Sequence, residues 1–215
     1  MRKNLLIVFI CGLLLLSSTV AYSKKGVYVS GNLGMALPGN SDVTDSELPG
    51  ITLEVRSDAG LACAGAIGYN FGNIRFEGEV SYQKNDLDEA KVNVLPGLDI
   101  PLTGDTSSLI FLLNGYYDFT NESPFSFFIT AGAGTAKVEL NDFNVQGFAL
   151  LGVPNYSNDD TVFAYQAGAG VGYAINETVT FDVKYRYLGT SDPDFDTTTI
   201  EYSSHNIYAG VRITF

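Results

Sequence analysis

Apolar and polar residues alternate along eight separate segments of this 215-residue chain. In the last segment, Ile207–Phe215, every second residue is Ile, Ala, Val, Ile and Phe in turn, and Tyr, Gly, Arg and Thr stand between them. A period of two is that of a β-strand, in which successive side chains point to opposite faces. After the first 23 residues, the longest stretches without a charged residue, Ala59–Ile74 and Thr161–Asn176, have 16 residues and are rich in Gly. Since a membrane-spanning helix needs about 18 or more apolar residues, the sequence predicts an all-β chain.

Each segment is long enough to cross a bilayer as a tilted strand, which takes about 9–11 residues. The expected strands are Val27–Ala36, Ala59–Phe71, Ile74–Gln83, Thr106–Phe119, Phe125–Val138, Thr161–Ala174, Val179–Tyr187 and Ile207–Phe215. Tight turns rich in Asn, Gly and Ser alternate with long connections. The tight turns are Asn70–Asn73, Thr120–Ser123 and Asn176–Glu177, and the long connections are Leu37–Ser57, Lys84–Asp105, Glu139–Asp160 and Gly189–Glu201. This layout predicts a transmembrane eight-stranded antiparallel up-and-down β-barrel with short periplasmic turns and four long extracellular loops.

A soluble sheet with its apolar face turned inward would show the same alternation. In hydrocarbon, however, every backbone N–H and C=O group must be paired within the protein, so a membrane-spanning sheet has to close into a barrel. Aromatic residues stand mainly on the apolar faces and near strand ends, where the girdles of membrane barrels are expected. These residues include Phe71, Tyr82, Tyr117, Phe119, Phe125, Tyr173 and Tyr187. The alternative is that they form the core of a soluble sandwich.

The first 23 residues have the plan of a secretory signal peptide. Residues 2–3 are basic, Leu5–Leu16 is an apolar core, and small residues suited to cleavage follow. We expect cleavage after Ala21 or Ser23, which leaves residues 24–215 as the barrel domain. The alternative is a short N-terminal anchor helix, although this apolar core is shorter than the ~20 residues that span a bilayer.

The face opposite the apolar one carries small residues, tyrosines and eight charged residues. A barrel of about eight strands has an interior just wide enough to be filled by side chains. Charges shut inside it must be paired, because an isolated buried charge is very costly. Four positive and four negative side chains can all pair, so we expect a plugged, salt-bridged lumen; a narrow pore for small solutes is the alternative. The expected lumen charges are Arg75, Glu77, Glu79, Asp118, Asp182, Lys184, Arg186 and Arg212.

Three pieces of the sequence resemble a known family. Gly68–Asn73 and Gly170–Asn176 look like strand-to-turn pieces, and Tyr208–Phe215 is an alternating strand that ends on Phe. On these motifs the chain resembles the small eight-stranded outer-membrane barrels, OmpA-like and opacity-protein-like surface proteins of the porin family, over essentially all of residues 24–215. The resemblance implies an integral protein of the outer membrane of a Gram-negative bacterium, in contact with outer-membrane lipid. It also implies that the outer-membrane assembly machinery recognises a C-terminal signal made of Tyr208, Val211, Ile213 and Phe215.

The motifs indicate no enzymatic activity. Some small outer-membrane barrels modify lipid A, and the lipid A deacylase type uses Ser, His and an acid on its outer face. Glu201, Ser203 and His205, the only histidine, fall on one face of the last strand and are the residue types of acyl transfer. Residues two apart on a strand lie about 6.6–6.8 Å apart along its axis, so a direct relay needs side chains that lean together. We therefore predict a non-enzymatic protein, with a lipid A-modifying enzyme as the weaker alternative.

Carboxylates gather in two of the long connections without completing a metal-binding motif. They are Asp86, Asp88 and Glu89 in one connection and Asp192, Asp194 and Asp196 in another. Carboxylate oxygens attract divalent cations, but the spacing of a calcium loop is absent. The glycines of Gly168–Gly172 alternate along a strand and open no helix, so they indicate barrel packing and not a nucleotide loop. We expect neither a metal site nor a cofactor.

The chain is 46% hydrophobic and 17% charged, with 12 Lys and Arg against 24 Asp and Glu. The four long connections hold 17 of the acidic residues and three basic ones, and the rest of residues 24–215 is balanced. This excess of acid excludes nucleic acid as a partner, because phosphates are held through Lys and Arg. Acidic loops repel anionic surfaces unless divalent cations or basic partners intervene. We expect a protein of envelope integrity or surface contact and adhesion, which binds a surface or host ligand through its loops.

Overall fold

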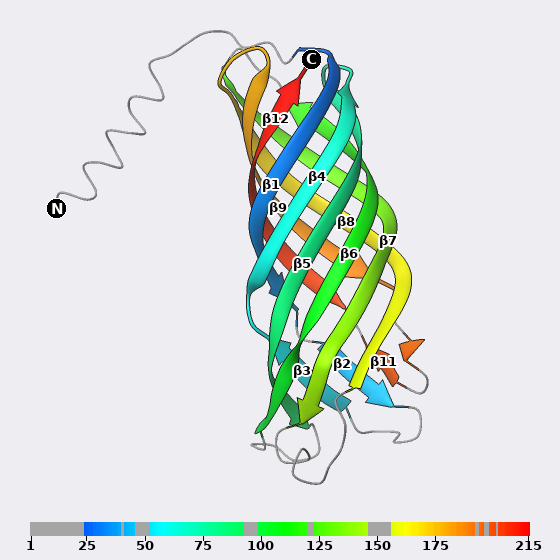
Figure 1. The fold of residues 1–215 in the computed structure, drawn as a ribbon. Coiled ribbons are helices and arrows are strands. Elements are labelled where there is room, and N and C mark those ends of the chain that lie inside the picture. Colours follow the sequence, from blue (N-terminus) through cyan, green and yellow to red (C-terminus); the bar gives the residue numbers. More distant parts are fainter. Residues whose placement is uncertain are drawn as a thin grey trace, which may run out of the picture.

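The computed structural model describes residues 24–39, 41–45, 52–92, 99–119, 123–145, 156–191, 194–195, 198–200 and 202–215. The predicted signal peptide, residues 1–23, lies outside the described residues. Within the described ranges the chain forms twelve β-strands (Figure 1). No helix among these residues has the length and apolar character that a membrane span requires.

Eight of the strands close into an antiparallel barrel (Figure 1). Each barrel strand pairs with the next barrel strand along the chain, and the last pairs with the first. The barrel strands are β1 (Gly26–Pro38), β4 (Gly60–Asn70), β5 (Ile74–Val92), β6 (Asp99–Phe119), β7 (Phe125–Val145), β8 (Tyr156–Ala174), β9 (Val179–Thr190) and β12 (Ser203–Thr214). The predicted eight-stranded up-and-down barrel is confirmed.

The barrel closes at a seam between β1 and β12, the first and last strands. The pairing runs without a break from Tyr28 opposite Thr214 to Pro38 opposite Ser204. Beyond the Tyr28–Thr214 pair, the Phe215 N–H donates to the Val27 carbonyl at 2.8 Å. A Cβ atom at Gly26 would lie 2.3 Å from the Phe215 carbonyl oxygen. Glycine is therefore required where the two ends of the chain meet.

The alternation in the sequence decides which side chains face outward. Leu33, Leu61 and Leu113 keep 72%, 78% and 76% of their surface exposed, whereas the inward neighbours Asn32 and Leu112 are buried. Most aromatic residues of the outward faces are exposed as well, and Phe125, Tyr173 and Tyr187 are half-buried, so they do not form the core of a soluble sandwich. An apolar surface that surrounds the whole barrel wall far exceeds what a soluble monomer exposes. It matches the lipid-facing band of a membrane barrel.

Regular structure continues beyond the predicted strand ends. β5, β6, β7 and β8 all extend into connections that the sequence predicts as loops. Four further short strands lie in the first and fourth long connections: β2 (Ser41–Asp45), β3 (Thr52–Ser57), β10 (Asp194–Phe195) and β11 (Thr198–Ile200). The long connections therefore contain strands that the sequence analysis did not predict. Beyond the apolar band both faces of a strand can be polar, so pairing persists there without the alternation that reveals it.

The outward position of Val183, midway along the barrel part of β9, generates a first prediction. Val183 is 44% exposed on the apolar wall, and arginine near the bilayer midplane costs about 2–4 kcal/mol. We expect Val183→Arg to lower the free energy of unfolding in lipid by this amount, measured by urea titration with heat-modifiable gel migration. Thr180→Arg, on the other face of β9, is the control. Equal effects of the two substitutions would show that the faces are assigned wrongly.

Candidate functional site: the lumen and the loop end

The eight predicted lumen charges all lie inside the barrel and are buried. They come from four strands, β5, β6, β9 and β12, and each keeps 8% or less of its surface exposed. Alternation brings them inward because each stands at a position of the same parity as the small and polar residues of its strand. Which of them meet is decided by how the strands pair around the barrel.

Two of the arginines make two-pronged pairs with aspartates. Arg75 Nε and Nη2 lie 2.7 and 3.0 Å from the carboxylate oxygens of Asp118. Arg212 Nε and Nη2 lie 3.0 and 3.2 Å from those of Asp182. Parallel N–H···O bonds of this kind are strong and geometrically specific. Both pairs stand in the half of the barrel nearer the tight turns.

Aromatic rings surround the Arg75 guanidinium on its remaining sides. The guanidinium carbon lies 4.2 Å from the ring centre of Tyr116, 5.3 Å from that of Phe128 and 5.7 Å from that of Tyr28. The negative face of an aromatic ring attracts such a cation, most strongly where water is excluded. The rings therefore fill the lumen around the ion pair and stabilise it at the same time.

In the middle of the lumen, acidic and basic side chains do not pair one to one. Glu79 accepts from both Lys184, at 3.1 Å, and Arg186, at 2.5 Å. Glu77 instead accepts hydrogen bonds from the hydroxyls of Tyr28, at 2.8 Å, and Tyr116, at 2.6 Å. The expectation that every charge has an opposite charge as its partner was therefore wrong for Glu77. Lys184 and Arg186 stand two residues apart on β9, so both reach the same carboxylate.

Three neutral residues, which the sequence gave no reason to single out, connect these groups. The Asn114 side-chain amide lies 3.3 Å from Glu77 and 3.4 Å from Glu79. The Gln166 amide donates to Asn114 and to the Thr130 hydroxyl, at 3.0 Å each. Their inward parity was visible in the sequence, but their meeting depends on strands far apart along the chain. The result is a continuous polar network across the lumen.

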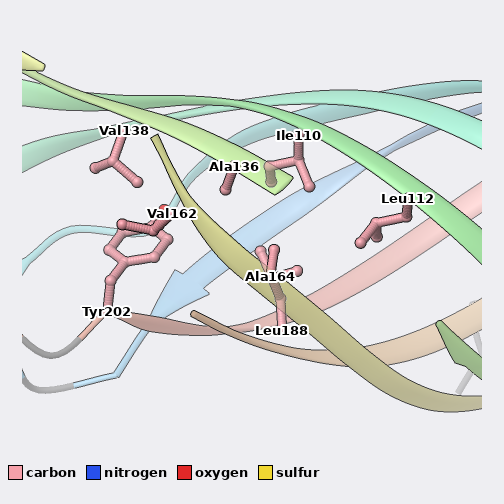
Figure 2. Close-up of a cluster of buried hydrophobic side chains, with 8 residues drawn as sticks. All are labelled: Ile110, Leu112, Ala136, Val138, Val162, Ala164, Leu188 and Tyr202. Atoms are coloured by element: carbon pink, nitrogen blue, oxygen red, sulfur yellow. The ribbon is translucent and has the colours of Figure 1, made fainter. Parts of the chain in front are cut away.

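Toward the loop end, one side of the lumen is apolar. Seven buried residues from β6 to β9 and Tyr202, which directly precedes β12, form the cluster: Ile110, Leu112, Ala136, Val138, Val162, Ala164, Leu188 and Tyr202. Figure 2 shows the Tyr202 ring at one end of this cluster and Leu112 at the other. The Tyr202 hydroxyl accepts hydrogen bonds from Gln83 and Ser108. Burial raises the pKa of the Tyr202 phenol above its usual value of about 10.

The four residues of the predicted C-terminal signal do not share one face. Val211, Ile213 and Phe215 face outward, with 42%, 37% and 63% of their surface exposed. Tyr208 points into the lumen, where its hydroxyl accepts from Arg186 Nη2 at 2.8 Å. Tyr208 is therefore tied to the charge network, and the other three residues are presented on the outer wall.

Ser203 and His205 are not arranged as a catalytic relay. The His205 ring leans toward β9, where its Nδ1 lies 2.6 Å from the Tyr185 hydroxyl and its ring packs against Tyr187. The Ser203 hydroxyl lies beside Gly39, which follows β1, the strand that pairs with the other edge of β12. Glu201, the third residue of the set, lies outside the described residues.

The sequence analysis named carboxylates in two of the long connections. Most of their side chains lie outside the described part of the chain: Asp88, Glu89, Asp192, Asp194 and Asp196. Among the described residues, no three His, Cys, Asp or Glu side chains gather as metal ligands do. Cys63 is a free, exposed thiol on the outward face of β4.

A closed barrel with an apolar wall and a buried polar interior defines this protein as a transmembrane β-barrel. The chain belongs to the outer membrane protein beta-barrel domain family, which matches residues 7–215. It is thus an integral protein of the bacterial outer membrane.

Similarity to individual proteins agrees with this assignment. Outer membrane protein PagN of Salmonella typhimurium is 28% identical over 97% of this chain and 89% of its own. RC1281 of Rickettsia conorii, described as a candidate adhesin, is 29% identical over 47% of this chain and 45% of its own. The crystal structure of Neisserial surface protein A shares the fold, with a TM-score of 0.56 and 19% identity over 88% of this chain and 97% of that one.

The Arg75–Asp118 pair generates a second prediction. Asp118→Ala leaves Arg75 buried without its carboxylate, so we expect the free energy of unfolding to fall by about 3–5 kcal/mol. Replacing both residues, Arg75→Met with Asp118→Leu, is expected to cost less because no unpaired charge remains. Urea titration of each variant in lipid measures both changes. A double variant as unstable as the single one would contradict the claim that Asp118 stabilises the protein by pairing with the buried charge of Arg75.

Proposed function

We propose that this protein is a non-enzymatic outer-membrane barrel with a closed lumen, which acts in surface contact and adhesion through its acidic loop end. A contribution to envelope integrity follows from the same anchored barrel. The observation that carries the proposal is that the charges of the lumen differ from those of the long connections. Charges inside the barrel are buried and matched with partners of the lumen, whereas the excess acid of the chain stands in the extracellular connections.

Burial at successive depths of the lumen supports its closure. Near the tight turns, Arg75 and Arg212 keep 2% and 4% of their surface exposed. In the middle, Glu79 and Arg186 keep 2% and 1%, and near the loops Ile110 keeps none. A water-filled channel would leave the side chains along it exposed to solvent. Side chains that are nearly without exposed surface at all three depths favour a plug.

The geometry of the last strand supports the non-enzymatic part of the proposal. His205 engages a tyrosine of β9 and Ser203 lies toward the first loop, so the imidazole is not placed to take a proton from the hydroxyl. General-base catalysis needs the two groups within hydrogen-bond reach. This arrangement supports the proposal that the pair has no part in acyl transfer.

Assembly through the C-terminal strand is part of the proposal. Val211, Ile213 and Phe215 present an apolar row on the outer wall next to the seam. An assembly partner would contact these three side chains during insertion, before β12 pairs with β1. The inward Tyr208 would then join the lumen network as the barrel closes.

Surface contact is supported by charge and by one relative. The four long connections carry 17 acidic and three basic residues, so they favour a basic partner. The candidate adhesin of Rickettsia conorii matches about half of this chain, which makes adhesion the form of contact that we propose.

Closure of the lumen is tested by conductance. We expect the purified protein in planar bilayers to give no stable unit conductance, because the interior is filled by paired side chains. Arg75→Ala and Arg212→Ala test the plug, and Lys137→Ala, an exposed residue outside the lumen, is the matched control. A unit conductance in the unmodified protein that changes in the two lumen variants, but not in the control, would overturn the closed lumen.

Surface contact is tested with proteoliposomes on beads coated with polylysine or with heparin. We expect binding to polylysine and not to heparin, and a marked loss between about 0.1 and 1 M salt, where the Debye length falls from about 10 to 3 Å. The matched variant carries Asp42→Asn, Asp45→Asn and Glu54→Gln and should bind polylysine more weakly. Binding that prefers heparin, or that salt leaves unchanged, would contradict the proposal.

A further inference from the structure

The first and fourth extracellular connections pair with each other above the barrel seam. β11 of the fourth connection pairs antiparallel with β2 of the first, with Thr198, Thr199 and Ile200 opposite Asp45, Thr44 and Val43. The two strands lead directly into β12 and β1, whose pairing forms the seam below them. Between the two ladders the Gly39 N–H donates to the Ser203 carbonyl at 2.9 Å. The seam thus continues outward from the barrel as a second strand pair.

This strand pair belongs to a larger sheet. β2 also pairs with β3, β3 pairs with the outer part of β5, and β10 pairs with β11. The order β10-β11-β2-β3-β5 joins three connections by main-chain hydrogen bonds. Figure 1 shows β2, β3 and β11 of this sheet beyond the barrel, at the end away from the C-terminus. A segment held on both sides by such bonds opens far less easily than an isolated loop. The paired strands of the two connections therefore form one hydrogen-bonded sheet.

Tyr202 fixes the fourth connection to the barrel at the junction of β11 and β12. Its ring lies in the apolar cluster at the loop end of the lumen (Figure 2). Its hydroxyl accepts from Gln83 of β5 and from Ser108 of β6, the latter at 3.1 Å. Its carbonyl accepts from the backbone N–H of Thr190, at 3.1 Å, and from the Thr190 hydroxyl, at 3.2 Å. One residue thus holds three barrel strands at the base of the connection.

Asn85 does the same for the first connection. It stands two residues beyond Gln83 on β5 and is 2% exposed. Its side-chain amide donates to the Ala36 carbonyl at 3.0 Å and to the Asp58 carbonyl at 2.9 Å. These carbonyls lie where the connection leaves β1 and where it returns toward β4. Both connections are therefore anchored to neighbouring positions of β5.

We propose that the paired strands β2, β3, β10 and β11 of the first and fourth connections form one composite interaction surface, which Tyr202 and Asn85 hold in place for a basic polypeptide partner. The inference rests on the proposed function in surface contact and names the part of the surface that makes it. The strands β2, β3, β10 and β11 that build this surface hold four acidic residues and one basic residue, so the composite surface is complementary to a cationic chain. Because the surface is ordered before the partner arrives, binding does not include the entropic cost of ordering two loops.

Hydrogen exchange and peptide binding test the proposal on the full barrel in lipid. We expect Tyr202→Ala to speed amide exchange about tenfold or more in both 41–45 and 198–200, without change in the barrel strands. It should also weaken binding of a polylysine peptide of about 20 residues by roughly fivefold, through loss of pre-ordering. Tyr202→Phe keeps the ring and is expected to have a smaller effect. Tyr185→Ala, an exposed tyrosine on the outer wall, is the matched control, and heat-modifiable migration shows which variants fold.

The decisive comparison is between the two connections. Faster exchange in 198–200 with no change in 41–45, in Tyr202→Ala or in Tyr202→Phe, would overturn the composite surface. An unmodified protein that does not bind the peptide would overturn the basic partner and the proposed mode of contact. The exchange result decides the composite surface independently of that outcome.

Discussion

Pairing of backbone polar groups in an apolar medium is the constraint on which the rest of this structure depends. In hydrocarbon, no water replaces a missing partner for an N–H or C=O group, so the sheet must close. Closure at β1 and β12 fixes the number of strands, and the number of strands fixes how much room the interior has. The tight meeting of Gly26 with Phe215 follows from the same closure, because the ends of the chain must pair there. Everything inside the barrel is adapted to that width.

Because the barrel is closed, protein groups must stabilise every charge in its interior in place of water. Two-pronged pairs such as Arg75–Asp118, aromatic rings around the guanidinium, and phenols on Glu77 are three solutions to the same problem. Each replaces the solvation that water would have given. At the loop end the solution changes to apolar packing around Tyr202. That change places a rigid base beneath the extracellular strands.

Particular residues show which features of the structure the sequence predicts and which it does not. The period of two placed Tyr208 inside and Val211 outside, and it separated buried Leu112 from exposed Leu113, because parity along a strand is a local property. It did not reveal that β5 to β8 continue past the apolar band, since strands with polar residues on both faces look like loops. Nor did it reveal that Glu79 takes two cations while Glu77 takes two phenols, because both glutamates have the same parity and the same neighbours in sequence.

The sequence by itself determined the strands of the barrel wall, the face that each residue takes, and the concentration of acid in the long connections. These properties depend on the order of residue types along one segment. Only the tertiary structure decided which charge meets which partner, that β2 pairs with β11, and that Tyr202 spans three barrel strands. Some of these contacts join residues more than a hundred positions apart, as Lys184 and Glu79 are. They depend on the stagger of strands around a closed barrel, which no single segment encodes.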